Sequence, residues 1–407
     1  DRGLPVKGCR DHCNIVVAKH PQGEAGFVIL FDEAYEMFNL LRRHAGFILS
    51  SREAQRLAGN KEKTVVNPYP VLKRNIAELE GVAQDSCLLF PSGMAAVFSS
   101  IMSCLDKTRI GLVLLGSAYV DTICILEKWP ALRGTKPATF ICDVEDLQAV
   151  ESVVGRETAA VILEIPTNPL VRIIDLERIV EISHRCGAKV IVDNTVATPF
   201  NLNPFNYDAD IVVHSTTKFL SGMNNHFGGA ALSKDRGTLT ALADFQDLTK
   251  SYMDVAEAEV LCSNLANFES RMRTINHNAL VVAEFLSENS KIGKVYYPGL
   301  RDHPDRDLAK RYLPKGCSGL ISFVLKNSNW TNAATFYDNL AAPIIKGPSL
   351  GAEQTLLCPY TLLAHYHDPA DKIRQMGLDR YLFRISVGTE NPASIVGALA
   401  ESLNLVE

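Results

Sequence analysis

Short, unbroken apolar runs alternate along the chain with segments whose apolar residues recur every three or four positions. The runs are rich in β-branched residues and lack polar alternation, which predicts parallel strands buried on both faces. The intervening segments predict amphipathic helices. Strands are expected at 87–90, 110–115, 160–164, 190–192 and 211–213, and helices at 71–81, from residue 95 onward and at 175–187. This alternation favours a mostly parallel α/β sheet between about residues 65 and 250.

The pattern changes beyond residue 252, where a long helical tract covers about 266–286. Further strands are expected at 319–325 and 381–386, and further helices at 331–340 and 392–403. We therefore expect an N-terminal arm with a helical segment at residues 1–64, a large α/β domain at 65–255 and a smaller C-terminal α+β domain at 256–407.

Composition excludes several classes of partner. The chain has 407 residues, 47% apolar content and a formal net charge of −5, which gives no reason to expect nucleic acid or an anionic membrane as a partner. No apolar run approaches the roughly 20 residues of a membrane span, and the first residues lack the apolar segment of a signal peptide. The ten cysteines are scattered, as expected for free thiols in a reducing, cytoplasmic compartment. Cys9, His12 and Cys13 lack a second ligand pair at a zinc-like spacing, so we predict no metal site.

Two of the predicted strands lead into residues with candidate chemistry, Asp193 and Lys218. Ligands of open α/β sheets bind beyond the carboxyl ends of the strands, so we expect both residues to face one crevice. A plain ion pair or a solvated lysine is the simpler alternative. Pyridoxal 5'-phosphate (PLP) would use the whole group: an amine for a Schiff base, a carboxylate that keeps the ring nitrogen protonated, and the hydroxyls of Ser215 and Thr217 for the phosphate.

Two stretches here carry a specific resemblance. DNTVATP from Asp193 to Pro199 and ADIVVHSTTKFLSG from Ala209 to Gly222 resemble the Cys/Met-metabolism group of PLP enzymes, which includes cystathionine γ-synthases and lyases, methionine γ-lyase and homoserine sulfhydrylases. The resemblance extends over about residues 70–390. It implies the aminotransferase-like fold type I, a seven-stranded, mostly parallel sheet with helices on both faces, PLP as cofactor, and a homotetramer built as a dimer of dimers.

The resemblance assigns further residues to the cofactor. Gly93 and Met94 form a strand-to-helix turn, which is a weak signal alone, and their backbone N–H groups would hold the phosphate. Tyr119, at a position that is more often core or rim, would stack on the ring and assist proton movement as a catalytic residue. Asn168, first of all a turn residue, would lie beside the phenolic oxygen of the cofactor and the substrate. Thr195 is also assigned to cofactor binding.

Two C-terminal residues are candidates for substrate binding. Arg384 interrupts an apolar strand, and a buried guanidinium needs an anionic partner, which in the simplest case is a structural salt bridge. The resemblance implies instead that Arg384 binds the substrate α-carboxylate through two parallel hydrogen bonds. Ser349 would help to hold the same carboxylate.

The chain departs from the family pattern before Asn67. Relatives carry a Tyr-Ser-Arg run whose Tyr and Arg hold the phosphate of the neighbouring subunit's cofactor, whereas this chain reads Glu62-Lys63-Thr64. Lys63, Lys73 and Arg74 are the candidate replacements, although solvation at the surface explains each of them as well.

The resemblance implies γ-replacement on an O-acyl-L-homoserine, with Lys218 as general base and a vinylglycine-type ketimine intermediate. The stretches ICILEKWP and CPYTLLAHY resemble the fungal cystathionine γ-synthase branch, which favours an O-acetyl ester as substrate and cysteine as nucleophilic cosubstrate. A carbon nucleophile such as acetoacetate in specialised metabolism, a sulfhydrylase and a γ-lyase remain alternatives. A non-catalytic scaffold is a further one, and a nicotinamide dehydrogenase is disfavoured because no G-x-G-x-x-G follows the first strand.

Overall fold

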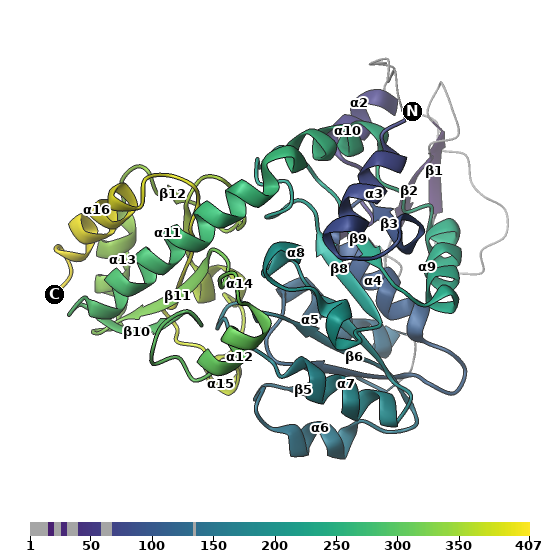
Figure 1. Ribbon diagram of the computed structural model, residues 1–407, viewed down its shortest axis with the longest axis horizontal. Helices are drawn as coiled ribbons and strands as arrows, with labels where there is room; N and C mark the ends of the chain where they lie inside the picture. The colour runs from purple at the N-terminus through teal and green to yellow at the C-terminus, as the bar shows by residue number, and fades with distance from the viewer. Residues whose placement is uncertain (1–14, 20–25, 31–39, 58–66, 133–135) are drawn as a thin grey trace.

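A computed structural model describes residues 15–19, 26–30, 40–57, 67–132 and 136–407 of the chain (Figure 1). Its larger sheet has seven strands; β8, β7, β6, β4 and β5 run parallel, and β9 pairs antiparallel with both β8 and β3. In spatial order the strands are β3 (Cys87–Phe90), β9 (Gly229–Leu232), β8 (Ile211–Ser215), β7 (Lys189–Asp193), β6 (Thr158–Glu164), β4 (Gly111–Leu115) and β5 (Thr139–Ile141). The expected α/β class is confirmed, with β9 and β5 as strands that the apolar pattern did not predict.

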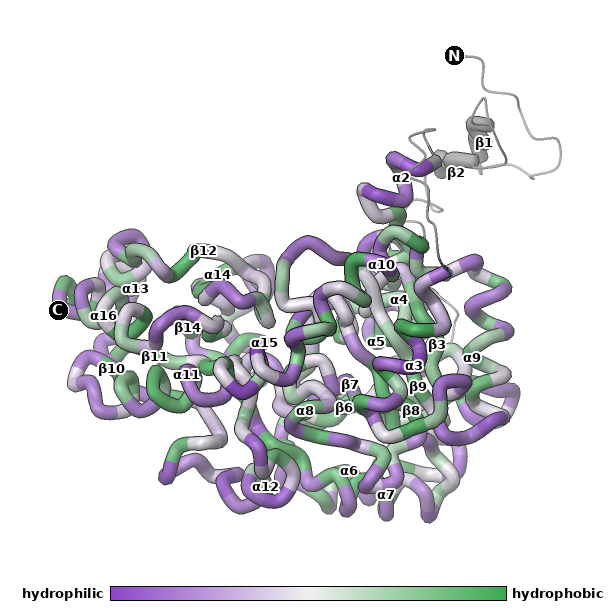
Figure 2. The backbone as a smooth tube through the Cα atoms, turned by 45° about the horizontal axis from the view of Figure 1, so that its top comes forward, coloured by the Kyte–Doolittle hydropathy of each residue, from purple (hydrophilic) through white to green (hydrophobic). Residues whose placement is uncertain are grey.

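Helices cover both faces of this sheet. Successive residues of a strand point to opposite faces, and the odd-numbered Val113 and Val161 accordingly belong to one core cluster with α3, α6 and α7, while Leu112 and Ile162 belong to another with α4 and α9. The helices of this part of the chain are α3 (Tyr69–Leu79), α4 (Gly93–Cys104), α5 (Val120–Leu132), α6 (Leu147–Val153), α7 (Leu176–Arg185), α8 (Thr198–Asn201) and α9 (Arg236–Thr249), with short 3-10 helices at Gln84–Ser86 and Pro204–Tyr207. In Figure 2, hydrophobic stretches run through the strands, and hydrophilic ones lie on outer segments such as α12 (Arg306–Tyr312).

Helix α7 shows why the sequence pattern located the helix expected at 175–187. The Asp175 carboxylate caps its start by accepting the Arg178 N–H at 3.4 Å, and Gly187 follows its end with a φ of +72°, which favours glycine. Leu176 and Ile179 lie on its buried side. The chain then enters β7, so that the helix returns it to the edge of the sheet where β6 begins, and the two parallel strands end side by side.

The C-terminal part forms a second, five-stranded sheet, in the order β10-β11-β14-β13-β12. Its strands are β10 (Ile292–Tyr296), β11 (Leu320–Leu325), β12 (Ile345–Lys346), β13 (Leu356–Pro359) and β14 (Phe383–Ser386), and its helices are α12 (Arg306–Tyr312), α13 (Trp330–Asp338), α14 (Tyr360–Ala364), α15 (Ala370–Gln375) and α16 (Pro392–Leu403). Helices α10 (Val255–Asn264) and α11 (Phe268–Glu288), with a 3-10 turn at Leu265–Asn267, connect it to the larger sheet, and α11 extends from α10 across the C-terminal part in Figure 1. The smaller α+β unit is confirmed, whereas the division at residue 255 stays a prediction.

The described arm contains a hairpin, β1 (Ile15–Lys19) and β2 (Gly26–Leu30), that the sequence pattern did not predict. A short π-helix, Leu40–His44, and helix α2 (Ser51–Leu57) follow. None of the helices in the described ranges has the length and apolarity needed to cross a membrane.

Candidate active site

A cavity of about 460 Å³ lies beyond the carboxyl ends of the parallel strands and reaches residues of the smaller sheet. Strands β6, β7 and β8 end in Glu164, Asp193 and Ser215, all of which line it. The structure brings every predicted site residue to this cavity: Gly93, Met94, Tyr119, Asn168, Asp193, Thr195, Ser215, Thr217, Lys218, Ser349 and Arg384.

Lys218 lies in the turn that follows β8. Its backbone N–H donates to the Ser215 carbonyl at 3.1 Å, and its Nζ donates to Ser349 Oγ at 3.0 Å. Burial, followed by the positive charge of Arg384, lowers the pKa of the Lys218 amine to about 8. A substantial fraction of the amine is therefore neutral near pH 7.5, as a nucleophile or a base requires.

Asp193 is the carboxylate at the end of β7. Its Oδ1 accepts the Thr195 N–H at 3.0 Å, and Thr195 Oγ1 in turn accepts the Ser215 N–H at 2.8 Å, which joins the ends of β7 and β8. Burial raises the pKa of Asp193, while the hydrogen bonds from Thr195 and the charge of His214 lower it. The carboxylate is thus directed at the cavity with few protein donors to satisfy it.

A buried polar cluster lies behind Asp193. His214 Nε2 is 2.7 Å from Glu80 Oε1, and Asn194 Nδ2 donates to the same oxygen at 2.8 Å. Both side chains of the His214–Glu80 pair are completely buried. Glu80 Oε2, His214 Nδ1 and Asn194 Oδ1 have no hydrogen-bond partner among the described residues. Buried polar groups of this kind are costly unless they are paired. The cluster acts on the site through Asp193, because the charge of His214 lowers the pKa of that carboxyl.

The start of helix α4 forms an anion cradle. Ser92 Oγ accepts the Ala95 N–H at 2.9 Å, which leaves the N–H groups of Gly93 and Met94 at the positive end of the helix. A Cβ added to Gly93 would lie 2.6 Å from Ser215 Cβ, so only glycine fits there. The cradle therefore offers backbone donors and a hydroxyl in one concave surface.

Arg384 extends from β14 to the opposite side of the cavity. Its Nη1 donates to Asn168 Oδ1 at 2.9 Å, its Nη2 donates to the Pro348 carbonyl, and its guanidinium lies 4.8 Å from the centre of the Tyr360 ring. Arg384 is 5% exposed, yet no carboxylate of the described residues lies within ion-pair distance. The salt-bridge interpretation is therefore wrong for the described part of the chain, and the positive charge is available to a carboxylate in the cavity.

Tyr119 and Glu164 line the cavity wall between the start of α4 and Arg384. Glu164 Oε2 accepts the Tyr119 N–H at 3.0 Å. Burial, and then the negative charge of Asp193, raises the pKa of Glu164 well above its usual value. Removal from water, and then the carboxylate of Asp121, raises the pKa of the Tyr119 phenol. The Tyr119 phenol therefore stays protonated at neutral pH and can donate a hydrogen bond.

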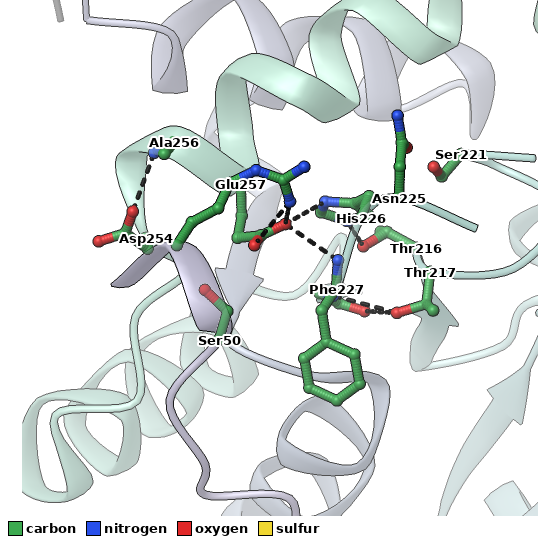
Figure 3. Close-up of polar contacts among 12 residues, drawn as sticks. Ser50, Thr216, Thr217, Ser221, Asn225, His226, Phe227, Asp254, Ala256 and Glu257 are labelled. Atoms are coloured by element: carbon green, nitrogen blue, oxygen red, sulfur yellow. Dashed lines mark hydrogen bonds and ion pairs between the residues drawn. The ribbon is translucent and has the colours of Figure 1, made fainter. Parts of the chain in front are cut away.

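A buried network holds the turn after β8 from behind (Figure 3). Glu257 of α10 lies 3.2 Å from His226 Nδ1 and accepts the Phe227 N–H at 3.0 Å, and His226 Nε2 lies 2.9 Å from Thr216 Oγ1. Arg52 of α2 pairs with Glu257 at 3.0 Å. Burial acts to raise the pKa of Glu257, but the hydrogen bonds from His226, Phe227 and Arg52 outweigh it and lower the pKa to about 2. The network connects α2 of the N-terminal arm to the turn after β8.

Of the three candidate replacements for the arm contact, the two that the structure describes do not line this cavity. Lys63 lies outside them, as do Cys9, His12 and Cys13. Lys73 and Arg74 lie on α3 and do not line the cavity.

Sequence reasoning missed four functional candidates. Glu164 and His214 lie at the ends of strands β6 and β8, close to residues that were predicted. Their position at the carboxyl ends of parallel strands could have identified them as candidate site residues. Glu80 is the C-cap residue of helix α3, and Arg43 lies in the π-helix and lines the cavity. In both places an isolated charged residue normally faces solvent, so no signal in the sequence indicated a function.

Comparison with known proteins gives consistent matches. A family model described as Cys/Met metabolism PLP-dependent enzyme matches residues 49–404. The chain is 36% identical over 354 residues to cystathionine gamma-synthase of Neurospora crassa, covering 83% of this chain and 54% of that protein, so it spans about half the length of that relative. It is 31% identical over 346 residues to cystathionine gamma-lyase of Bacillus subtilis, covering 85% of this chain and 89% of that protein.

A solved structure agrees with these matches. The cystathionine gamma-lyase from Lactobacillus plantarum, complexed with L-serine, superimposes with a TM-score of 0.77 at 28% sequence identity, covering 83% of this chain and 86% of that chain.

Proposed function

This chain belongs to the Cys/Met metabolism PLP-dependent enzymes, and we propose that it catalyses γ-replacement on an O-acyl-L-homoserine. The preferred acyl group in this proposal is acetyl, and the nucleophile is cysteine, so that the product is cystathionine. The observation that carries the proposal is a buried amine with a lowered pKa, Lys218, in one cavity with the buried and unpaired guanidinium of Arg384.

PLP is the cofactor of the family, and the residues present fit it. The cradle that a Cβ at Gly93 would fill accepts a phosphate, Lys218 offers the amine, and Asp193 offers a carboxylate to the ring nitrogen. Bound PLP supplies an aldehyde for amine condensation and a protonated ring that withdraws electrons from the substrate.

Each residue has a separate task in this proposal. Arg384 binds the substrate α-carboxylate and Ser349 assists it, which orients the bonds at Cα. Lys218 Nζ, close to neutral at working pH, takes the proton from Cα and then moves a proton from Cβ, so that the group at Cγ departs. Tyr119 Oη, which is protonated at neutral pH, donates a hydrogen bond to the departing oxygen.

Similarity to the Neurospora crassa cystathionine gamma-synthase supports replacement by cysteine rather than elimination. The same catalytic residues serve replacement by a carbon nucleophile such as acetoacetate, replacement by sulfide, and the γ-lyase reaction, in which protonation and hydrolysis give a 2-oxo acid and ammonia. The choice depends on the shape of the outer pocket. These reactions are therefore the alternatives that the decisive experiment has to distinguish.

The experiment is a competition assay on the PLP-loaded protein, with O-acetyl-L-homoserine, cysteine, sulfide and acetoacetate present together and all products followed by mass spectrometry. We expect cystathionine as the dominant product and its loss in the Lys218→Ala variant. A carbon-linked amino acid would assign the chain to specialised biosynthesis, 2-oxobutyrate alone would identify a γ-lyase, and no turnover would identify a scaffold.

A further inference from the structure

Three cations line the active-site cavity: Arg43, Lys218 and Arg384. Two of them have a task in the proposed reaction. Arg43 has none, and it makes no hydrogen bond or ion pair with another described residue. We infer that Arg43 binds the phosphate of PLP and neutralises part of its charge from within the same chain.

The arm segment that carries Arg43 lies against the anion cradle. The Gly46 carbonyl accepts Ser92 Oγ–H at 2.8 Å, directly at the start of α4. Gly46 has a φ of +68°, and a Cβ added there would lie 2.8 Å from Met94 Cβ and 3.0 Å from the Ala95 nitrogen. No side chain fits between the segment and the first turn of α4, so the arm packs directly on the helix end that holds the anion.

Two further contacts hold the segment on either side. His44 Nδ1 is 2.6 Å from Asp121 Oδ1, next to the start of α5, and Arg52 pairs with Glu257 at 3.0 Å. Arg43 directly precedes the first of these contacts. Its guanidinium therefore starts from a fixed backbone position, which reduces the entropy lost when it binds an anion.

The charge of the phosphate requires such a group. A phosphate monoester carries close to two negative charges at neutral pH, whereas the cradle itself contributes only neutral donors: the N–H groups of Gly93 and Met94 and the hydroxyls of Ser215 and Thr217. An arginine supplies the planar, permanently charged fork that phosphate oxygens accept. Arg43 is the one lining cation of the described residues that has no other partner.

The competing explanation is that Arg43 binds a carboxylate of the second substrate. A pair of ligands separates the two, because pyridoxal has the ring and aldehyde of PLP and lacks the phosphate. The test titrates apo-protein with PLP and with pyridoxal and follows the absorbance of the bound ligand. It compares the wild type with Arg43→Gln, Arg43→Lys and, as a matched surface control, Arg236→Gln, whose side chain is 90% exposed.

We expect Arg43→Gln to raise the Kd of PLP by about 10- to 100-fold, the effect of losing hydrogen bonds to a charged group, and to leave the Kd of pyridoxal unchanged. Arg43→Lys should recover part of the loss, and Arg236→Gln should match the wild type. The inference is overturned if both Kd values rise equally, or if neither rises, including the case in which only the KM of the nucleophile increases. Because PLP binding alone is measured, this failure would leave the proposed reaction standing.

Discussion

Replacing one member of the buried Glu80–His214 pair with leucine removes their 2.7 Å contact in a site that water does not reach, and leaves Glu80 in the His214→Leu variant with the bond from Asn194 Nδ2 alone. A charged pair at 2.7 Å, with an effective dielectric constant of about 20, attracts by about 6 kcal/mol. Transfer of each charge out of water costs several kcal/mol, so the intact pair contributes little net stability. Removal of one charge retains the cost for the other and loses the attraction. We expect Glu80→Leu and His214→Leu each to reduce the free energy of unfolding by about 3–5 kcal/mol.

The double variant gives the sharper result. Leucine at both positions has a similar volume and leaves no charge behind, and Asn194 Nδ2 keeps its 3.0 Å bond to the Leu202 carbonyl. Such a replacement is often neutral or stabilising. We therefore expect the double variant to lie within about 2 kcal/mol of the wild type, with a coupling free energy of at least about 3 kcal/mol.

Urea-induced unfolding of the four apo-proteins, followed by circular dichroism, measures these differences from the midpoints at a common slope. If the cost of the double variant equals the sum of the two single costs, the charges are not coupled and the reasoning fails. PLP affinity provides a separate measurement: because the charge of His214 lowers the Asp193 pKa, even the stable double variant should bind PLP more weakly.

Two further predictions concern the cofactor. Gly93→Ala places a Cβ 2.6 Å from Ser215 Cβ and should raise the Kd of PLP at least about tenfold. The control variant Gly397→Ala, whose Cβ has nothing within 4 Å, should bind PLP as the wild type does. Equal Kd values in both variants would contradict the assignment of the phosphate to the start of α4. The rate at which PLP attaches to the apo-protein should rise with pH and level off above about 8, because only the neutral Lys218 amine reacts. Arg384→Gln removes a charge that lowers this pKa, so stopped-flow absorbance should show a midpoint at higher pH, and an unchanged or lower midpoint would exclude that influence.

The part of the site that the sequence predicted depends on local rules. Asp193 and Lys218 follow short apolar runs, and parallel strands present the residues at their carboxyl ends to one edge, so their meeting required only the correct strand assignment. The strand β9 was missed because its sequence, GAAL, is short and contains no β-branched or aromatic residue.

Contacts between distant segments were beyond the reach of these rules. Glu80 and His214 are separated by 134 residues, and no periodicity along either segment indicates that they meet. Arg384 was predicted as buried, but whether it pairs with a protein carboxylate or faces the cavity depends on which groups the second sheet places around it. Only the tertiary arrangement decides between these two.

The hydrogen bond from Arg384 to Asn168 joins residues 216 positions apart. Contacts of such sequence separation form slowly, since a long loop has to close before they contribute. On the ribosome, β7 with Asp193 and the turn after β8 with Lys218 emerge well before β14. The side of the cavity that contains Arg384 is thus assembled late in folding. A nascent chain that stops short of residue 384 would contain the cofactor residues but not the arginine proposed to bind the substrate carboxylate.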